Sequence, residues 1–185
     1  TYTVPRGTTA STGFDVLAHA FDAMSSVHAS PVSDSLALRA ASLALANLER
    51  AYNEPSDKEA RGAMAQASVI AGLAFSQTGT SGSHACSYIL TSKYGLPHGE
   101  ACAFTLDSWL AVNAEARPEL SDYAKQLGFD GIDALCKKLG EMKRALGMRT
   151  TLSDAGIAES ELDAVCQDAM ASANMKNNVA QIGLE

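Results

Sequence analysis

The chain has 185 residues, of which 46% are hydrophobic, and this size and composition are typical of a globular domain rather than a disordered protein. Fourteen lysines and arginines against 21 aspartates and glutamates give a net charge of −7 without a basic stripe, so no nucleic-acid partner is expected. No apolar run approaches the roughly 18 residues that span a bilayer, and the N-terminus does not resemble a secretory signal, so we expect no membrane partner.

The expected elements are helices, because no stretch alternates with period two over a convincing length. A first helix is expected by about residue 12. The second should begin near Pro31 with Ser33 as its N-cap, and the third after Ser56, which has Glu59 at the spacing of a capping box. Further helices are expected at residues 82–92, 99–114, 118–126, 130–146 and 159–172. The sequence therefore predicts an all-α domain of seven or eight helices.

The four cysteines are spread along the chain without a CxxC pair, at Cys86, Cys102, Cys136 and Cys166. In a chain long enough to form a core, we expect them to be reduced thiols that pack as small hydrophobic side chains. This cysteine usage favours a cytoplasmic location.

Two of the four histidines, His84 and His98, lie fourteen positions apart. An unbroken helix would hold them about 21 Å apart. The stretch "KYGLPHG" between them contains Gly95, Pro97 and Gly99, which are residues that interrupt helices. A helix, a turn and an antiparallel helix would bring the two imidazoles together, although the break does not by itself require it.

Asp15 and His19 form a second pair, at positions i and i+4 of an expected helix. This spacing places both side chains on one helix face, as in the HExxH helix of metalloproteases. An aspartate with three imidazoles suits zinc or ferrous iron and is poor for calcium. Catalytic sites of this kind leave one metal position open for substrate.

Structural roles for these residues are an alternative. An aspartate and a histidine on adjacent turns also form ordinary surface ion pairs, and His98 beside a Gly-Pro turn could be a loop histidine bonded to backbone. His28 lies in an expected loop without a partner, and we assign it to the surface. The spacing of the residues alone leaves both interpretations open.

Four segments resemble the C-terminal helical domain of the iron-containing (group III) alcohol dehydrogenases: "TGFDVLAHAFDA", "SDSLALRA", "GLAFSQTGTSGSHACSYILTSKYGLPHGEACAF" and "LDSWLAVNAEARPELSDYAKQLG". In that family a TGxDxLxHAxE helix supplies an aspartate and a histidine. A further histidine follows a glycine-rich turn, and the last comes from a PHG turn fourteen residues on. The resemblance therefore implies that Asp15, His19, His84 and His98 bind Fe²⁺ or Zn²⁺.

The resemblance also implies how the domains are organised. The family's fold, of the dehydroquinate synthase-like type, joins the helical domain to an N-terminal nucleotide-binding α/β domain, with the metal in the cleft between them. No GxGxxG or GGGS-like turn follows a strand here. We therefore expect residues 1–185 to be the C-terminal helical metal-binding domain, a fragment of a two-domain enzyme. The segment around Phe75 should border the nicotinamide and substrate cleft.

The activity implied by the resemblance is that of an NAD(P)-dependent alcohol dehydrogenase or aldehyde reductase. The metal would polarise the oxygen of a small alcohol or aldehyde for hydride transfer, and NAD(P) would be held mainly by the other domain. The chain alone should therefore be inactive, and the full-length enzyme is expected to be a homo-oligomer. The alternatives are an enzyme of the related glycerol dehydrogenase or dehydroquinate synthase type, and a non-catalytic helical module without metal.

The sequence departs from the family pattern at three positions. Tyr88 stands where many members carry another histidine, and its phenol could still form a hydrogen bond with the substrate. Asp22 replaces the usual glutamate. Glu100 follows the PHG turn where an apolar or small residue is commoner, and we expect its side chain to point to solvent or to a neighbouring ligand.

Overall fold

The computed structural model describes residues 2–183, and this part of the chain contains helices and no strand. The helices are α1 (Arg6–Met24), α2 (Pro31–Asn53), α3 (Lys58–Thr78), α4 (Gly82–Ser92), α5 (His98–Ala116), α6 (Glu119–Gln126), α7 (Ile132–Ala145) and α8 (Leu162–Ala171), with 3₁₀ helices η1 (Glu159–Glu161) and η2 (Ala173–Asn177). The predicted all-α fold is confirmed. No helix in the described part of the chain is long and apolar enough to cross a membrane.

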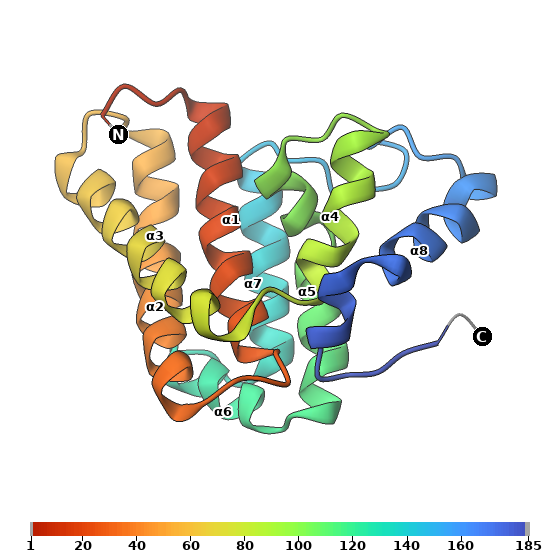
Figure 1. Ribbon diagram of the computed structural model, residues 1–185. Coiled ribbons are helices and arrows are strands. Elements are labelled where there is room, and N and C mark those ends of the chain that lie inside the picture. Colours follow the sequence, from red (N-terminus) through yellow and green to blue (C-terminus); the bar gives the residue numbers. More distant parts are fainter. Residues whose placement is uncertain (1, 184–185) are drawn as a thin grey trace.

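Helix α1 lies in the centre of the molecule (Figure 1). It packs against α2 and α3 on one side and against α4 and α5 on the other. Its large side chains Phe14, Leu17 and Phe21 are buried, and the facing helices present fully buried alanines such as Ala41 and Ala71. Small side chains at these contacts let the helix axes come close. Polar residues of α1 are therefore held in fixed positions inside the domain.

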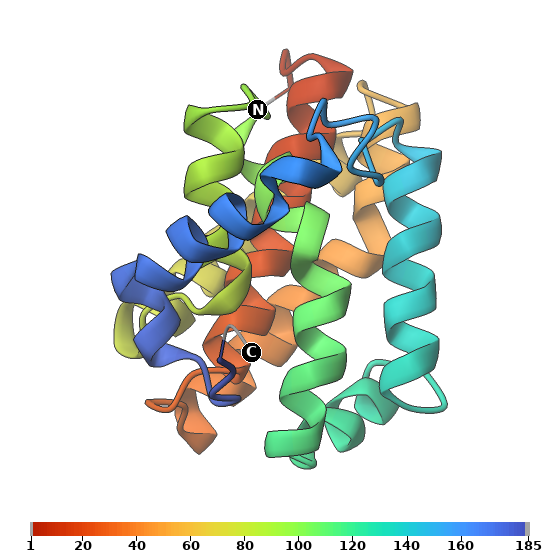
Figure 2. The ribbon, with the colours of Figure 1, turned by 90° about the vertical axis from the view of Figure 1, so that its right-hand side faces the viewer.

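The second half of the chain completes the domain around α1, and ion pairs of Arg117 with Asp34 and of Lys138 with Glu49 also join it to α2. Helices α5 and α7 run side by side (Figure 2), and α8 packs against α4 at the edge of the molecule. The chain after η2 returns to the end of α1, where Val27 and Asn177, and Ser25 and Val179, join through backbone hydrogen bonds. This return places the segment after η2 next to the start of α4.

Two predicted N-caps are wrong by one to three residues. The N-cap of α2 is Ser30, whose Oγ accepts a hydrogen bond from the Ser33 N–H, while Ser33 completes the capping box from inside the helix. Pro31 takes the first helical position, where its missing N–H costs nothing. The N-cap of α3 is Asp57 rather than Ser56, because the Asp57 carboxylate accepts from the Ala60 N–H.

The predicted break between the two histidines is present. Helix α4 ends at Ser92, Gly95 has a positive φ of 68°, and α5 begins at His98 itself. Helices α4 and α5 pack against each other. The chain thus folds back between His84 and His98.

Candidate metal centre

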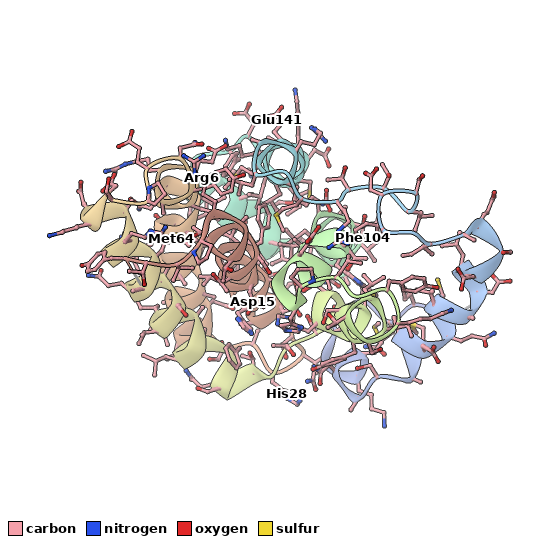
Figure 3. The ribbon with its side chains drawn as sticks, turned by 90° about the horizontal axis from the view of Figure 1, so that it is seen from above. Arg6, Asp15, His28, Met64, Phe104 and Glu141 are labelled. Carbon is pink, nitrogen blue, oxygen red and sulfur yellow. The ribbon has the colours of Figure 1, made fainter. Side chains whose placement is uncertain are left out.

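Three of the four predicted ligands converge where α1, α4 and α5 meet. Nε2 of His84, in the first turn of α4, lies 3.6 Å from Oδ1 of Asp15 on α1. Nε2 of His98, the first residue of α5, lies 3.7 Å from the same oxygen. Figure 3 shows Asp15 on the side of α1 that faces these helices. His84 and His98 follow Asp15 by 69 and 83 positions in the sequence, and all three residues share one site.

Glycine at position 99 makes this convergence sterically allowed. A Cβ atom there would collide with the backbone carbonyl oxygen of Ser11 and come within 2.9 Å of the Asp15 Cβ. The Ser11 hydroxyl in turn accepts a hydrogen bond from the Glu100 N–H. The start of α5 therefore touches α1 directly, and this contact brings His98 to Asp15.

Two polar atoms at the centre of the site lack a hydrogen-bond partner in the described part of the chain. Oδ1 of Asp15 and Nε2 of His84 are buried, and neither has a hydrogen-bond partner among residues 2–183. A buried polar atom left without a partner costs about 1–3 kcal/mol. A divalent cation between the two atoms would satisfy both of them. The donor set of one carboxylate and imidazoles therefore fits zinc or ferrous iron.

His19 lies beside this group rather than within its tightest part. Its Nδ1 is 3.9 Å from Oδ2 of Asp15, and its ring stacks on His84 at 4.5 Å between centroids. Among the described residues, the donor atoms that all lie within 4.8 Å of one another belong to Asp15, His84, His98 and Cys102. Cys102 did not figure among the predicted ligands.

Asp22 holds His84 in place. Its carboxylate accepts hydrogen bonds from the Ser81 N–H at 2.8 Å, the Ser83 hydroxyl at 2.9 Å and the His84 N–H at 3.2 Å, so it caps the start of α4 from α1. Its Oδ2 also lies 2.8 Å from Nδ1 of His84. Because Nδ1 donates to this carboxylate, Nε2 is the nitrogen available to a metal.

The sequence reasoning did not assign this role to Asp22. A signal was present, since Asp22 lies seven residues, or two helical turns, after Asp15 and therefore on a similar face of α1. His98 has a weaker partner of the same kind, because its Nδ1 lies 3.5 Å from the hydroxyl of Ser87.

Comparisons with known proteins identify the family. Residues 9–185 match the Fe-containing alcohol dehydrogenase family, C-terminal. The chain belongs to the iron-containing alcohol dehydrogenase family. The predicted resemblance is thereby confirmed, and the fold is the C-terminal helical fold of this family.

Family members of several kinds are similar to the chain. Long-chain-alcohol dehydrogenase 1 of Geobacillus thermodenitrificans is 36% identical over 92% of the chain and 45% of the relative. 1,3-Propanediol dehydrogenase of Klebsiella pneumoniae is 33% identical over 94% of the chain and 47% of the relative. The solved structure of sulfoacetaldehyde reductase from Bifidobacterium kashiwanohense in complex with NAD⁺ is 40% identical, with a TM-score of 0.95 over 100% of the chain and 49% of that protein. The chain thus spans about half the length of these family members.

Charge is balanced tightly within the candidate metal centre. Burial opposes ionisation of Asp15, but the nearby imidazoles, of which His84 acts most strongly, outweigh it and lower the Asp15 pKa. Burial likewise opposes the His84 cation, yet Asp15 and Asp22 outweigh it and raise the His84 pKa. For His19 burial dominates and lowers the pKa to about 4, so this imidazole is neutral at pH 7. A divalent cation would take over the balancing charge that a proton on His84 provides.

The aromatic rings around the site form a continuous row. Centroid distances are 4.2 Å from Phe75 to His19, 4.5 Å from His19 to His84, 5.5 Å from His84 to His98 and 6.3 Å from His98 to Tyr88. Phe75 comes from α3 and Tyr88 from α4. The row places Phe75 and Tyr88 at its two ends, beside the candidate ligands.

Glu100 and His28 are two further polar residues whose positions were predicted from the sequence. Glu100 points neither to solvent nor to the metal donors. Its carboxylate accepts hydrogen bonds from Nε, Nη2 and the backbone N–H of Arg149, which ties α5 to the segment after α7. That expectation was wrong because Arg149 lies 49 residues away in sequence. His28 is exposed, as predicted, on the loop after α1 (Figure 3).

Proposed function

We propose that residues 1–185 are the metal-binding domain of an NAD(P)-dependent alcohol dehydrogenase or aldehyde reductase. The observation that carries this proposal is the pair of buried, unpartnered atoms, Oδ1 of Asp15 and Nε2 of His84, with Nε2 of His98 beside them. Membership of a family described as iron-containing supports a metal at this point. The names of the relatives support alcohol and aldehyde chemistry rather than that of a dehydroquinate synthase.

The proposed ligands are Asp15, His19, His84 and His98, and the ion is Fe²⁺ or Zn²⁺. Such an ion supplies Lewis acidity to the oxygen of an alcohol or aldehyde. Asp15 contributes the negative charge that keeps the net charge of the centre low. Asp22 holds the His84 ring with Nε2 directed at the ion. His98 is the most exposed of the four, so the open side of the centre lies next to it.

Hydride transfer requires a nicotinamide beside the metal. Among residues 2–183 there is no strand and hence no strand–turn–helix unit that would hold a dinucleotide, so we assign most of NAD(P) binding to a second domain. The ring of Phe75, which stacks on His19, provides an apolar surface for the nicotinamide ring next to the centre. The similar reductase from B. kashiwanohense was solved with NAD⁺, which supports this cofactor.

Tyr88 is the proposed contact for the substrate chain. Its hydroxyl oxygen accepts a hydrogen bond of 2.9 Å from Nδ2 of Asn174, and the side chain is half exposed at the His98 end of the row. Because its oxygen is already an acceptor, its own O–H remains available as a donor. This arrangement favours a small alcohol or aldehyde with a second polar group. Sulfoacetaldehyde and 1,3-propanediol, named in two relatives, are molecules of this kind.

The test is a chimera that joins this chain to the nucleotide-binding half of the B. kashiwanohense reductase. After loading with zinc or ferrous iron, it should reduce sulfoacetaldehyde or propanal with NADH or NADPH, or oxidise 1,3-propanediol. His98→Ala should abolish this activity, and His28→Ala, at an exposed loop histidine, should preserve it. A folded, metal-loaded chimera without activity would contradict the proposal.

The chain alone supplies the complementary measurement. It should show no turnover with either nucleotide, because one side of the cleft is missing. Activity of the unfused chain would contradict the two-domain arrangement. The cytoplasmic location and the homo-oligomeric state of the complete enzyme stay predictions.

A further inference from the structure

Cys102 lies one helical turn after His98, on the same face of α5. Its side chain is completely buried, and its Sγ is 3.7 Å from Nε2 of His98. The sulfur is also within 4.8 Å of the donor atoms of Asp15 and His84. One thiol, one carboxylate and two imidazoles therefore surround the same small volume.

The separations between these donors match those around a tetrahedral ion. A thiolate sulfur about 2.3 Å from zinc and an imidazole nitrogen about 2.0 Å from it lie about 3.5 Å apart. The observed separations are 3.7 Å for Cys102 to His98, 3.6 Å for His84 to Asp15 and 3.7 Å for His98 to Asp15. The set of four needs only small adjustments to hold one ion.

A separate observation points to a ligand in this volume. Nε2 of His84, a residue that is 2% exposed, has no hydrogen-bond partner in the described chain and is directed at the same donors. An ion there would be within reach of both His84 and Cys102. The site therefore does not depend on the cysteine alone.

Packing is the usual role of a buried cysteine, and Cys102 does belong to the main hydrophobic core. Two other cysteines have hydrogen-bond partners away from the metal donors. Cys86 accepts from the indole N–H of Trp109, and Cys136 donates to the Asp107 carbonyl. Cys102 differs from them because its sulfur faces the imidazole of a candidate ligand.

We propose that Cys102, rather than His19, is the fourth ligand when the centre of Asp15, His84 and His98 holds zinc, and that it makes the centre prefer zinc to ferrous iron. The inference rests on the proposed metal site and deepens it. Imidazole and carboxylate suit both ions, whereas a soft thiolate favours zinc over an isolated ferrous ion. On binding, the thiol loses its proton to the solvent and the sulfur lone pair binds the ion.

X-ray absorption at the zinc edge, on the intact protein loaded with zinc alone, tests the proposal directly. A sulfur shell at about 2.3 Å should accompany the nitrogen and oxygen shell at about 2.0 Å. Loading with Co²⁺ instead should give a sulfur-to-cobalt charge-transfer band in the near ultraviolet. Cys102→Ser should lose both signals. Cys136→Ser, the same change at a partly buried cysteine away from the metal donors, should keep them.

Metal preference provides a second readout. Loss of a group that only orients a ligand weakens metal binding by about 10- to 100-fold, so loss of the sulfur ligand should weaken zinc binding by at least about tenfold. Ferrous iron binding should weaken less, so that the zinc-to-iron affinity ratio falls in Cys102→Ser. An unchanged ratio would contradict the proposal.

The outcomes separate this inference from the proposed function. Stoichiometric zinc without a sulfur shell in the unsubstituted protein would overturn ligation by Cys102 and leave the centre of Asp15, His84 and His98 standing. Because that spectrum uses no variant, the result does not depend on how a substitution folds. If the protein is helical by circular dichroism and binds no metal, both the inference and the metal centre are wrong.

Discussion

Nδ1 of His84 lies 2.8 Å from Oδ2 of Asp22, and both side chains are 3% exposed. This pair joins the start of α4 to α1 and leaves Nε2 of His84 directed at Asp15 and His98. Two residues that are 62 positions apart thereby set the orientation of one candidate ligand. The contact between Asp22 and His84 leads to predictions that can be measured.

Asp22→Asn should weaken metal binding by about 10- to 100-fold, because an amide orients and polarises the His84 ring less well than a carboxylate. Competition with a chromophoric chelator measures the affinity. Asp34→Asn is the matched control, since Asp34 is a buried aspartate that pairs with Arg117. It should lower the unfolding free energy without changing metal affinity. Equal affinities in wild type and Asp22→Asn would contradict the role given to Asp22.

Gly99→Ala should destabilise the domain by about 1–3 kcal/mol, because the added methyl group would meet the Ser11 carbonyl and force α5 away from α1. Urea unfolding measures this change. Gly72→Ala on α3 is the control, since a Cβ there has no neighbour within 4 Å. That helical substitution should stabilise by about 0.5–1 kcal/mol. If Gly99→Ala and Gly72→Ala shift the stability in the same direction, the contact between α5 and α1 does not require glycine at position 99.

The Glu100–Arg149 pair should make stability depend on pH. Burial would raise the Glu100 pKa, but hydrogen bonds from Arg149 outweigh it and lower the pKa. Stabilisation is therefore complete above the unfolded-state pKa of about 4.3 and is lost as the pH falls through the lower folded-state value. Glu100→Gln should cost about 1–3 kcal/mol near neutral pH and progressively less below about pH 4.

Denaturant unfolding of wild type and Glu100→Gln across this pH range measures the difference between them. Glu119→Gln, at an exposed glutamate on α6, is the control and should change the unfolding free energy little. A cost for Glu100→Gln that stays constant down to low pH would show that charge is not its origin.

Tyr88→Phe should raise KM for a substrate with a second polar group by about two- to tenfold, the equivalent of one hydrogen bond, and leave kcat nearly unchanged. The active chimera allows this measurement, with propanal as the comparison substrate that lacks the second polar group. Its KM should change little. Tyr52→Phe on α2 controls for loss of a phenol elsewhere. A fall in kcat with unchanged KM would assign Tyr88 a different role.

Short-range sequence patterns predicted much of this molecule. The i, i+4 pair of Asp15 and His19 depends only on helix geometry, and the Gly-Pro turn before His98 made a return of the chain foreseeable. The family resemblance then connected these local patterns into one site. The same reasoning misplaced two helix caps by one to three residues, because Ser33 and Ser56 have suitable neighbours, Ser30 and Asp57, that compete for the same role.

Contacts between distant residues were not predictable in this way. Asp22 caps α4 and orients His84, and Glu100 binds Arg149, only because the helices pack as they do. From the sequence alone, Cys102 resembles an ordinary core residue. Its spacing from His98 indicates a metal site only once Asp15 and His84 are known to face it. Each of these features depends on how segments distant in the sequence pack together rather than on local propensity.

Elemental analysis of the protein after equilibration with zinc or ferrous iron under reducing conditions tests the metal centre most directly. The structure predicts a single metal ion per chain in the wild type and in His28→Ala. It also predicts loss of that ion in Asp15→Ala and in His98→Ala, with helical content retained by circular dichroism. A folded wild-type protein that binds no metal, or variants that retain it fully, would contradict a metal centre formed by α1, α4 and α5.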